Sequence, residues 1–382
     1  MNIIVVFGGK SCEHDVSIVT GVMVCNCLNK ENYNVIPVYI SKDNAFYTHK
    51  SLFNIENYKN IATPPPSRRP SKRGIQKLKK IVFIAGENIL YYKNGKKLKP
   101  VTKIDYAINC CHGGIGENGS LYGFLDACNI PVSSSRAFGA SVAMDKCFTK
   151  ILCKALNIKM LKHIEISDRE YGANEAGIIE HAVSSLKLPI MVKPANLGSS
   201  IGITKAVDLE SLKSGLKTAF EYDTKVLLEH ALTGFTELFC AAYKLNNEII
   251  VSECEKAVLK NDMLTFGDKY DAGIKSRPDR IFPYLDNKDI TDQIKNITKT
   301  VYSELDLNGI VRIDFLVKNK EVYLNEINTI PGSLAYYLFC KNFGEFSGLL
   351  DKLISCDVEE YNNKSKLQYS FQSEVLEIKS GK

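Results

Sequence analysis

The stretch Val311-Arg-Ile-Asp-Phe-Leu-Val-Lys-Asn-Lys-Glu-Val-Tyr-Leu-Asn-Glu-Ile-Asn-Thr-Ile-Pro331 predicts a β-hairpin, because two apolar runs flank a turn-like Lys318-Asn319-Lys320. Within each run the apolar residues are interrupted by two polar side chains spaced two residues apart. Side chains with that spacing lie on one face of a strand. These polar residues are Arg312 and Asp314 on the first run, and Glu326 and Asn328 on the second.

A hairpin centred on Lys320 places Asp314 opposite Glu326, and in the same way Arg312 opposite Asn328. Facing carboxylates repel each other across a sheet, so the pairing is favourable only if a cation lies between them. Two carboxylates and an amide oxygen are hard ligands that suit Mg²⁺, with Mn²⁺ as a possible substitute. The alternative is an exposed strand face with charges placed by chance. The apolar residues in between, and the Pro331-Gly332 that follows at once, argue against it.

The bulk composition is that of an ordinary globular protein. The chain has 382 residues, of which 45% are hydrophobic and 24% charged, so two or three domains are expected. Its twelve cysteines include no C-x2-C pair. Cys110, Cys111 and Cys240 lie in apolar, strand-like runs, which predicts buried, reduced thiols rather than a zinc site.

The formal charge of +6 is mild, and part of it falls in one segment, Arg68–Arg73, with further lysines up to Lys80. This segment could bind nucleic acid. We favour a solvated insertion at about residues 63–80, because it follows Pro64-Pro65-Pro66 and contains no interleaved aromatic residues. We therefore expect no nucleic-acid partner.

The N-terminus, Met1–Phe7, predicts a buried strand rather than a signal peptide, because it has no basic region and runs directly into Gly8-Gly9. The sequence contains no apolar run of membrane-spanning length. We therefore expect a cytoplasmic protein with no membrane partner.

The first third of the chain alternates strands and helices, which is typical of a doubly wound α/β sheet with loops at its carboxyl edge. The expected strands are Ile3–Phe7, Asn34–Ile40 and Tyr106–Cys111, with a small hairpin at Ile81–Phe83 and Leu90–Tyr92 and a short extended piece at Ile130–Val132. The expected helices are Asp15–Asn29 and Ser120–Cys128.

The remainder predicts a mixed α+β arrangement that ends in the hairpin. The expected helices are Ala143–Asn157, Asn174–Leu186, Leu209–Tyr222 and Asp289–Leu305. The expected strands are His163–Ile166, Ile190–Pro194, Gly202–Ala206, Val226–Glu229, Thr236–Leu245 and Ile249–Glu253. After about Cys356 the sequence becomes polar, and we expect a loosely held tail.

A glycine- and serine-rich loop lies between two of these strands, Lys193-Pro-Ala-Asn-Leu-Gly-Ser-Ser-Ile-Gly202. Its glycines permit tight turns, and Ser199 and Ser200 offer hydroxyl and N–H groups to an anion. Lys193 ends the preceding strand and can reach a phosphate. A plain hairpin turn would explain the glycines alone, but the lysine, the serines and the carboxylate pair together favour nucleotide phosphate binding.

Three further positions are candidates for binding small polar ligands. Glu13-His14 follows the Gly8-Gly9 loop, where it could instead serve as an acidic helix N-terminus. His112 ends a buried strand beside a glycine-rich loop, and a histidine there is as often structural as functional. Lys269-Tyr270 lies in a long polar loop, Lys260–Arg277, and loops of that length are either lids or disordered insertions.

Together these motifs resemble the D-alanine–D-alanine ligases of the ATP-grasp superfamily. Four motifs occur in the family's order, and the resemblance spans nearly the whole chain to about residue 355. They are Phe7-Gly-Gly-Lys-Ser-Cys-Glu-His-Asp-Val-Ser17, His112-Gly-Gly-Ile-Gly-Glu-Asn-Gly119 with the later Met144-Asp-Lys146, Lys193-Pro through Gly202, and Arg312-Ile-Asp through Gly332.

The resemblance implies an N-terminal domain at residues 1–140, followed by two ATP-grasp subdomains at 141–230 and 231–356 that hold ATP between them, and a polar tail at 357–382. Lys146, Lys193 and Ser200 would contact the ATP phosphates, with the adenine near Glu229 and Glu237. Asp314, Glu326 and Asn328 would hold Mg²⁺.

The resemblance also implies the roles of residues around the amino-acid substrates. Glu13 would bind the ammonium group of the first D-alanine, and Ser199 and Tyr270 would hydrogen-bond to Glu13 and close the site. His112 would lie near the first carboxylate and Lys269 near the transferred phosphate. Arg312 and Gly332 would stabilise the oxyanion. The family also implies a homodimer and a role in peptidoglycan precursor synthesis.

The sequence differs from the family pattern at the residues expected to bind the second substrate. In many members a Ser-Leu pair binds the carboxylate of the second substrate. This pair lies a few residues after the Pro-Gly. Here that position reads Tyr337-Leu338, whereas Ser333-Leu334 directly follows Gly332 and is our candidate for this contact. Relatives that make D-alanyl–D-lactate lack the tyrosine that matches Tyr270, so an amine nucleophile is expected, either D-alanine or D-serine.

Two other classes of function stay open at this point. The chain could be a nucleotide-binding protein that has lost catalysis, in which case it would bind ATP without forming ADP. It could be a basic nucleic-acid binder, in which case it would bind duplex DNA in a salt-sensitive way that depends on residues 64–73.

Overall fold

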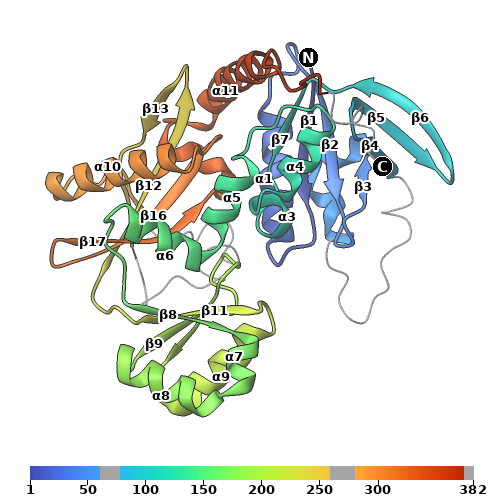
Figure 1. The fold of residues 1–382 in the computed structure, drawn as a ribbon. Helices are drawn as coiled ribbons and strands as arrows, with labels where there is room; N and C mark the ends of the chain where they lie inside the picture. Colours follow the sequence, from blue (N-terminus) through green and yellow to red (C-terminus); the bar gives the residue numbers. More distant parts are fainter. Residues whose placement is uncertain (61–77, 259–279, 374–382) are drawn as a thin grey trace.

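The computed structural model describes residues 1–60, 78–258 and 280–373. These residues form three β-sheets, each covered by helices (Figure 1). The sheets follow one another along the chain, and the predicted α/β fold class, with α+β regions after the first sheet, is confirmed.

The first sheet has the strand order β6-β5-β4-β3-β2-β1-β7. Strand β1 pairs in parallel with β2 and β7, and the remaining pairs from β2 to β6 are antiparallel. The strands are β1 (Asn2–Gly8), β2 (Asn34–Ile40), β3 (Phe46–Thr48), β4 (Lys79–Ile84), β5 (Glu87–Asn94), β6 (Lys97–Lys103) and β7 (Tyr106–Asn109). The expected short piece at Ile130–Val132 contributes one parallel bridge, from Val132 to Ala107.

Both faces of strand β1 are buried, which explains its unbroken apolar sequence. One face packs in a core with helix α1 (His14–Cys27) and the later helix α11 (Phe343–Lys364). The other packs in a core with helix α4 (Ser120–Ala127). Helix α1 lies so close to the strand that a Cβ atom at Gly21 would come within 2.3 Å of the Phe7 ring. This close packing fixes the start of α1, where Glu13 lies.

The second sheet is antiparallel in the order β10-β9-β11-β8 and carries its helices on one face (Figure 1). Its strands are β8 (His163–Ser167), β9 (Ile190–Pro194), β10 (Thr204–Ala206) and β11 (Lys225–His230). Its helices are α7 (Asp168–Ala173), α8 (Glu175–Leu186) and α9 (Leu209–Phe220). Helix α7 was not predicted, because none of its residues is buried and its sequence has no apolar periodicity.

The predicted helix Ala143–Asn157 is confirmed over Lys146–Ala155, but its start is wrong. Two helices, α5 (Ala137–Met144) and α6 (Lys146–Ala155), meet at Asp145, whose backbone is extended. The Asp145 carboxylate accepts hydrogen bonds from the N–H groups of Cys147 and Phe148, so it caps α6. The break makes Lys146 the first residue of α6.

The third sheet runs β15-β14-β12-β16-β17, with β13 also paired to β12, and helix α10 (Lys288–Glu304) packs against it. Its strands are β12 (Thr236–Leu245), β13 (Glu248–Val251), β14 (Glu255–Ala257), β15 (Arg280–Ile281), β16 (Val311–Lys318) and β17 (Glu321–Asn328). Strands β14 and β15 are too short for the sequence pattern to reveal, and they were not predicted.

The predicted hairpin register is confirmed at the polar positions. Asp314 pairs with Glu326, and Arg312 pairs with Asn328. The turn itself is tighter than a hairpin centred on Lys320, because Lys318 pairs with Glu321. The difference is absorbed by a bulge at Asn325, which lies between Leu324, the partner of Phe315, and Glu326.

The expected loosely held tail after Cys356 is wrong as far as Lys364, because helix α11 continues to that residue. Glu360 accepts hydrogen bonds from Arg136 at 2.6 Å and lies 2.9 Å from the Lys244 ammonium. The Tyr106 hydroxyl donates a hydrogen bond to Asp357. These contacts fasten the end of α11 to the first sheet and to β12.

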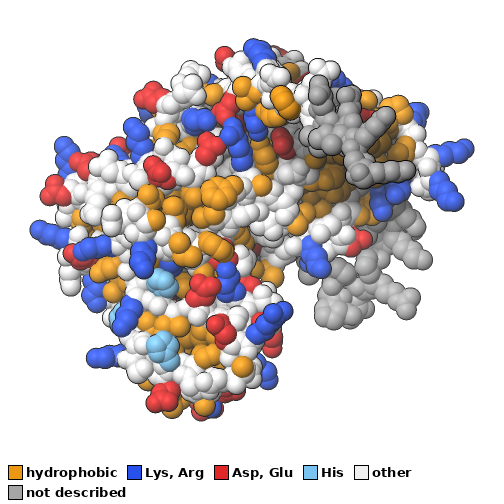
Figure 2. All heavy atoms as spheres, viewed as in Figure 1, with side chains coloured by type: hydrophobic (Ala, Val, Ile, Leu, Met, Phe, Trp, Pro, Cys, Tyr) orange, Lys and Arg blue, Asp and Glu red, His pale blue; other side chains and the backbone are white. Residues whose placement is uncertain are grey.

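Positive and negative side chains are interspersed over the face seen in Figure 2. The bulk of the predicted basic insertion, residues 61–77, lies outside the described residues. Cys110, Cys111 and Cys240 are buried, as predicted. None of the helices in the described parts of the chain is long and apolar enough to cross a membrane.

Candidate active site

The carboxylate of Glu13 lies where the loop between β9 and β10 of the second sheet reaches the start of helix α1. Glu13 precedes helix α1, is 6% exposed, and accepts a hydrogen bond from the Ser199 hydroxyl. A Cβ atom at Gly113 would lie 2.7 Å from the carboxylate, and one at Gly198 would lie 3.0 Å from it. Two glycine backbones therefore form walls on either side of this carboxylate. The hydrogen bond predicted between Ser199 and Glu13 is present.

The loop that brings Ser199 to Glu13 has an unusual backbone. Ser199 and Ser200 have φ angles of 54° and 60°, in the left-handed region that residues with a Cβ atom rarely adopt. Such conformations persist where surrounding contacts hold them, and they concentrate at ligand-binding sites. The hydrogen bond to Glu13 is one such contact.

His112 is buried, and its Nε2 lies 2.8 Å from the Thr20 hydroxyl of helix α1. Burial, together with the positive charge of Arg312, lowers the pKa of His112 to about 4, although a hydrogen bond with the Ile330 backbone opposes the shift. The imidazole is therefore neutral at neutral pH. The Thr20 hydroxyl also accepts a hydrogen bond from the N–H of Ser333 at 3.3 Å.

Glu117 is a site residue that sequence reasoning missed. Its carboxyl group accepts hydrogen bonds from the N–H of Gly113 at 2.9 Å and from the N–H of Ile330 at 3.0 Å. It therefore ties the loop after His112 to the segment after the hairpin. Burial raises the pKa of Glu117 to about 8, with a further contribution from the Glu13 charge. The sequence feature that could have revealed Glu117 is an acidic residue within the glycine-rich loop that follows His112.

Replacing Glu117 by glutamine should destabilise the protein by about 1–3 kcal/mol, because the new amide NH₂ faces a backbone N–H at Gly113 or Ile330 and leaves a buried donor without an acceptor. Urea unfolding at pH 7 measures this change. Ser120→Ala, at an exposed position on helix α4 nearby, is the control and should unfold like the parent. Equal stability of both variants would show that the two hydrogen bonds contribute nothing.

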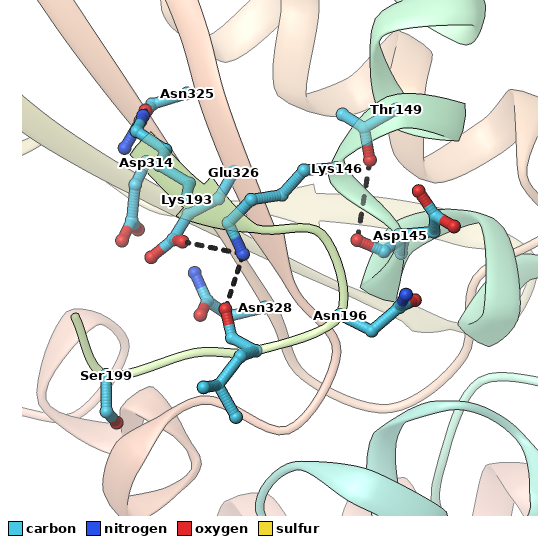
Figure 3. Close-up of polar contacts among 12 residues, drawn as sticks. Asp145, Lys146, Thr149, Lys193, Asn196, Ser199, Asp314, Asn325, Glu326 and Asn328 are labelled. Atoms are coloured by element: carbon cyan, nitrogen blue, oxygen red, sulfur yellow. Dashed lines mark hydrogen bonds and ion pairs between the residues drawn. The ribbon is translucent and has the colours of Figure 1, made fainter. Parts of the chain in front are cut away.

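Lys146 connects the glycine- and serine-rich loop after Lys193 to the hairpin. Its ammonium group donates to the Leu197 carbonyl at 2.6 Å and lies 3.8 Å from the Glu326 carboxylate (Figure 3). The placement follows from the break at Asp145, which sets Lys146 at the start of α6 beside the loop.

Lys193 lies on strand β9 and its ammonium group makes two contacts. It donates to Glu229 at 2.6 Å and to the Asn325 side-chain oxygen at 3.2 Å. Lys150, which sequence reasoning missed, reaches the other oxygen of Glu229 at 2.5 Å. Burial raises the pKa of Glu229, but the two ammonium groups outweigh it and hold that pKa down at about 2. The predicted role of Glu229 near the adenine stays a prediction.

The hairpin presents its polar side chains to the same region. Arg312 donates to both oxygens of Asp314, at 2.7 and 2.8 Å, and its guanidinium lies 4.9 Å from the centre of the Phe239 ring. Asn325, the bulge residue, lies beside Glu326 and contacts Lys193, so the bulge adds a second amide to this face. Figure 3 shows Lys146 and Lys193 close to these carboxylates and amides.

This donor set fits a hard divalent cation. Two carboxylates face each other across the hairpin, and the amides of Asn325 and Asn328 flank them. Oxygen ligands of this kind suit Mg²⁺. Among the residues that the structure describes, no group of three or more His, Cys, Asp or Glu side chains could hold a metal, so a cation at the hairpin would draw on amides as well as acids.

Glu237 lies on β12 two residues before Phe239, which pairs with Asp314, so it lies on the same face of the third sheet. Lys269 and Tyr270 lie outside the described residues, and their predicted roles stay predictions.

The short helix η4 (Gly332–Leu338) contains three consecutive left-handed residues directly after Gly332. Ser333, Leu334 and Ala335 have φ angles of 53°, 50° and 45°. Such conformations cost about 1–2 kcal/mol per residue. The N–H of Ser333 donates to Thr20, and the N–H of Leu334 donates to the Pro331 carbonyl at 2.8 Å. Leu334 is buried in the first core. The N–H groups of Ser333 and Leu334, the residues expected to contact the second carboxylate, are therefore engaged within the protein.

Comparisons with known proteins agree on one family. The family model described as "D-ala D-ala ligase N-terminus" matches residues 2–135, and "D-ala D-ala ligase C-terminus" matches residues 152–355. The chain is 36% identical to the D-alanine–D-alanine ligase of Thermosipho melanesiensis, with 100% of both chains covered. It is 32% identical to that of Caldicellulosiruptor bescii, covering 97% of this chain and 98% of the relative.

Solved structures give the same result. The D-alanine–D-alanine ligase of Helicobacter pylori superposes with a TM-score of 0.72 at 28% identity, covering 93% of this chain and 98% of that one. The VanG D-Ala:D-Ser ligase of Enterococcus faecalis superposes with a TM-score of 0.74 at 26% identity, covering 93% and 99%.

Proposed function

Because this chain belongs to the D-alanine–D-alanine ligase family, we propose that it joins two D-alanine molecules into D-alanyl-D-alanine, with conversion of ATP to ADP and phosphate. The product would serve peptidoglycan precursor synthesis. The observation that carries the proposal is the hydrogen bond from Ser199 to Glu13, which places a buried carboxylate suited to an ammonium group beside the serine loop suited to phosphates.

The reaction proceeds in two nucleophilic displacement steps. An oxygen of the first D-alanine carboxylate attacks the γ-phosphorus, and the bond from that phosphorus to the bridging oxygen of ADP breaks. The amine of the second amino acid then attacks the acyl carbon, phosphate leaves with the bonding pair, and the amine loses a proton. Phosphoryl transfer depends on positioning and charge neutralisation more than on covalent help from the protein.

The residues divide between these steps. Glu13 binds the ammonium group of the first D-alanine, and the loop at Ser199 closes over it. Lys146, Lys193 and Ser200 neutralise and orient the phosphates. Lys146 already lies beside Glu326, and Lys193 beside Asn325, so the ammonium groups are at the end of the site where the hairpin acids lie.

Asp314, Glu326 and Asn328 would hold Mg²⁺, which would neutralise phosphate charge when bound. Until then, the Arg312 guanidinium balances Asp314. Arg312 and the Gly332 N–H would stabilise the oxyanion of the tetrahedral intermediate. The neutral His112 would lie near the first carboxylate without adding a competing positive charge.

Substrate-dependent ADP release tests this function. Purified protein with ATP and Mg²⁺ should release ADP when D-alanine is present, and the product should have the mass of D-alanyl-D-alanine. L-alanine is the control and should give only background. Equal turnover with both enantiomers, or none with either, would refute the proposal. ATP binding without ADP release would instead identify a protein that has lost catalysis.

D-serine is the second candidate for the nucleophile, because the D-Ala:D-Ser ligase of Enterococcus faecalis shares the fold over nearly the whole chain. Mass analysis of products from an equimolar mixture of D-alanine and D-serine separates the two. We also propose a cytoplasmic homodimer that acts on small molecules rather than nucleic acid, in keeping with the resemblance to the family.

A further inference from the structure

The second amino acid must be held close to Arg312. Its amine has to reach the acyl carbon whose oxyanion Arg312 would stabilise, and in an α-amino acid the carboxylate is separated from the amine by only one tetrahedral carbon. The group that binds this carboxylate therefore lies within one amino-acid length of Arg312. The N–H groups of Ser333 and Leu334 already donate within the protein, so they are not free to bind this carboxylate.

Arg280 lies on the same face of the third sheet as the hairpin acids. It pairs with Ala257, two residues along β14 from Glu255. Glu255 in turn pairs with Phe239, and Phe239 pairs with Asp314. Directly paired residues, and residues two apart, share a face of a sheet. The register alone thus aligns Arg280 with the site, although it is far from Asp314 in the sequence.

The contacts of Arg280 hold it in that position. Its guanidinium donates to Glu255 at 2.9 Å and lies 4.9 Å from the centre of the Tyr337 ring. The Glu255 side chain is 3% exposed, whereas that of Arg280 is 35% exposed. The buried acid and the ring therefore hold the guanidinium in place, while the Arg280 side chain as a whole stays partly exposed.

Tyr337 lies near two guanidinium groups. Burial lowers the pKa of Arg280 and of Arg312, but neighbouring groups outweigh it and raise both pKa values. Tyr337 acts on both, beside Glu255 for Arg280 and after Asp314 for Arg312. In this chain an aromatic ring with an arginine against it therefore lies beside Arg312.

We propose that Arg280, supported by Glu255 and the Tyr337 ring, binds the carboxylate of the second amino acid and so selects a nucleophile that carries one. A guanidinium can form two parallel hydrogen bonds to a carboxylate. The inference rests on the proposed ligase function. Its competitor is a purely structural Arg280 that only neutralises Glu255.

A competition between two nucleophiles separates these roles. The enzyme is given ATP, Mg²⁺ and equal concentrations of D-alanine and D-alaninamide at one fixed pH, and the two dipeptide products are measured by mass. D-alaninamide has the same amine and methyl group but no carboxylate, and it cannot be phosphorylated as the first substrate. Wild type should strongly prefer D-alanine.

Arg280→Gln should lower the preference for D-alanine over D-alaninamide by about 10- to 100-fold, the size expected for loss of a charge-assisted hydrogen bond. Arg280→Lys should retain part of the preference. Tyr337→Phe should retain most of it, because the ring that supports Arg280 remains. Lys256→Gln is the matched control: Lys256 lies against the Tyr284 ring on the opposite face of β14 and should leave the preference unchanged.

Hydroxylamine supplies the second measurement. It traps D-alanyl phosphate as the hydroxamate and carries no carboxylate, so Arg280→Gln should form hydroxamate at close to the wild-type rate while losing dipeptide synthesis. An unchanged product ratio in both Arg280 variants would overturn the proposal, as would equal loss of hydroxamate and dipeptide. Absence of both products from the wild type would instead refute the ligase function itself.

Discussion

Replacing Glu326 by glutamine should reduce dipeptide synthesis by at least about 100-fold, equivalent to roughly 3 kcal/mol of lost transition-state stabilisation. The Glu326 side chain is 19% exposed, faces Asp314 across the hairpin, and lies 3.8 Å from the Lys146 ammonium. Glutamine keeps its size but removes one of the two negative charges proposed to hold Mg²⁺. The fold should survive, because Glu326 belongs to none of the hydrophobic cores.

Initial rates as a function of Mg²⁺ concentration measure this effect, and the variant should need more Mg²⁺ for half-maximal rate. Glu321→Gln is the control on the same strand, because Glu321 is exposed and pairs only at the surface with Lys159. It should behave like the parent in rate and in thermal unfolding. A Glu326→Gln enzyme with the parent's rate and Mg²⁺ dependence would remove Glu326 from the metal site.

Replacing Glu229 by glutamine should destabilise the protein by about 3–5 kcal/mol, because it leaves two buried ammonium groups without their shared carboxylate. The Glu229 side chain is 1% exposed and Lys150 is 2% exposed. Urea unfolding at pH 7 measures the change. Adding Lys150→Met to this variant should restore part of the lost stability, since it removes one of the uncompensated charges. Strictly additive effects of the two substitutions would contradict a shared ion pair.

The same contact predicts a pH dependence with a definite sign. The pKa of Glu229 falls from its ordinary 4.5 to about 2 in the folded protein. Between these values the unfolded chain binds the proton more tightly, so the stabilisation is complete above about pH 4.5 and is lost as the pH falls toward 2. The stability difference between wild type and Glu229→Gln should shrink over that window. Glu175→Gln, which removes an exposed ion pair with Lys213, should show no such trend.

The hairpin shows how much the sequence could predict and where prediction stopped. Alternation of polar and apolar residues indicated both strands and the pairing of Asp314 with Glu326, and both are confirmed. The bulge at Asn325 was not predictable, because the extra residue precedes Glu326 and so only adds a second polar residue to that end of the strand. Its position is tied to a contact with Lys193, which lies on another sheet.

The missed site residues have a similar explanation. Lys150 is an unremarkable lysine of an amphipathic helix until the fold brings it to Glu229. Glu117 was visible in the glycine-rich motif, but its partner at Ile330 is more than two hundred residues away. Arg280 belongs to a strand of two residues, too short to give a periodic signal.

The sequence alone established which segments of this protein form strands and helices, and which side chains share a strand face. It also indicated the family. These results follow from periodicity and motif order, which can be read from neighbouring residues. Only the tertiary structure decided which charges meet. The ion pairs of Glu229, the wall of glycines around Glu13 and the alignment of Arg280 with the hairpin all join segments far apart in the chain, and burial fixes their energies. Burial is set by the whole packed molecule, so no stretch of sequence contains it.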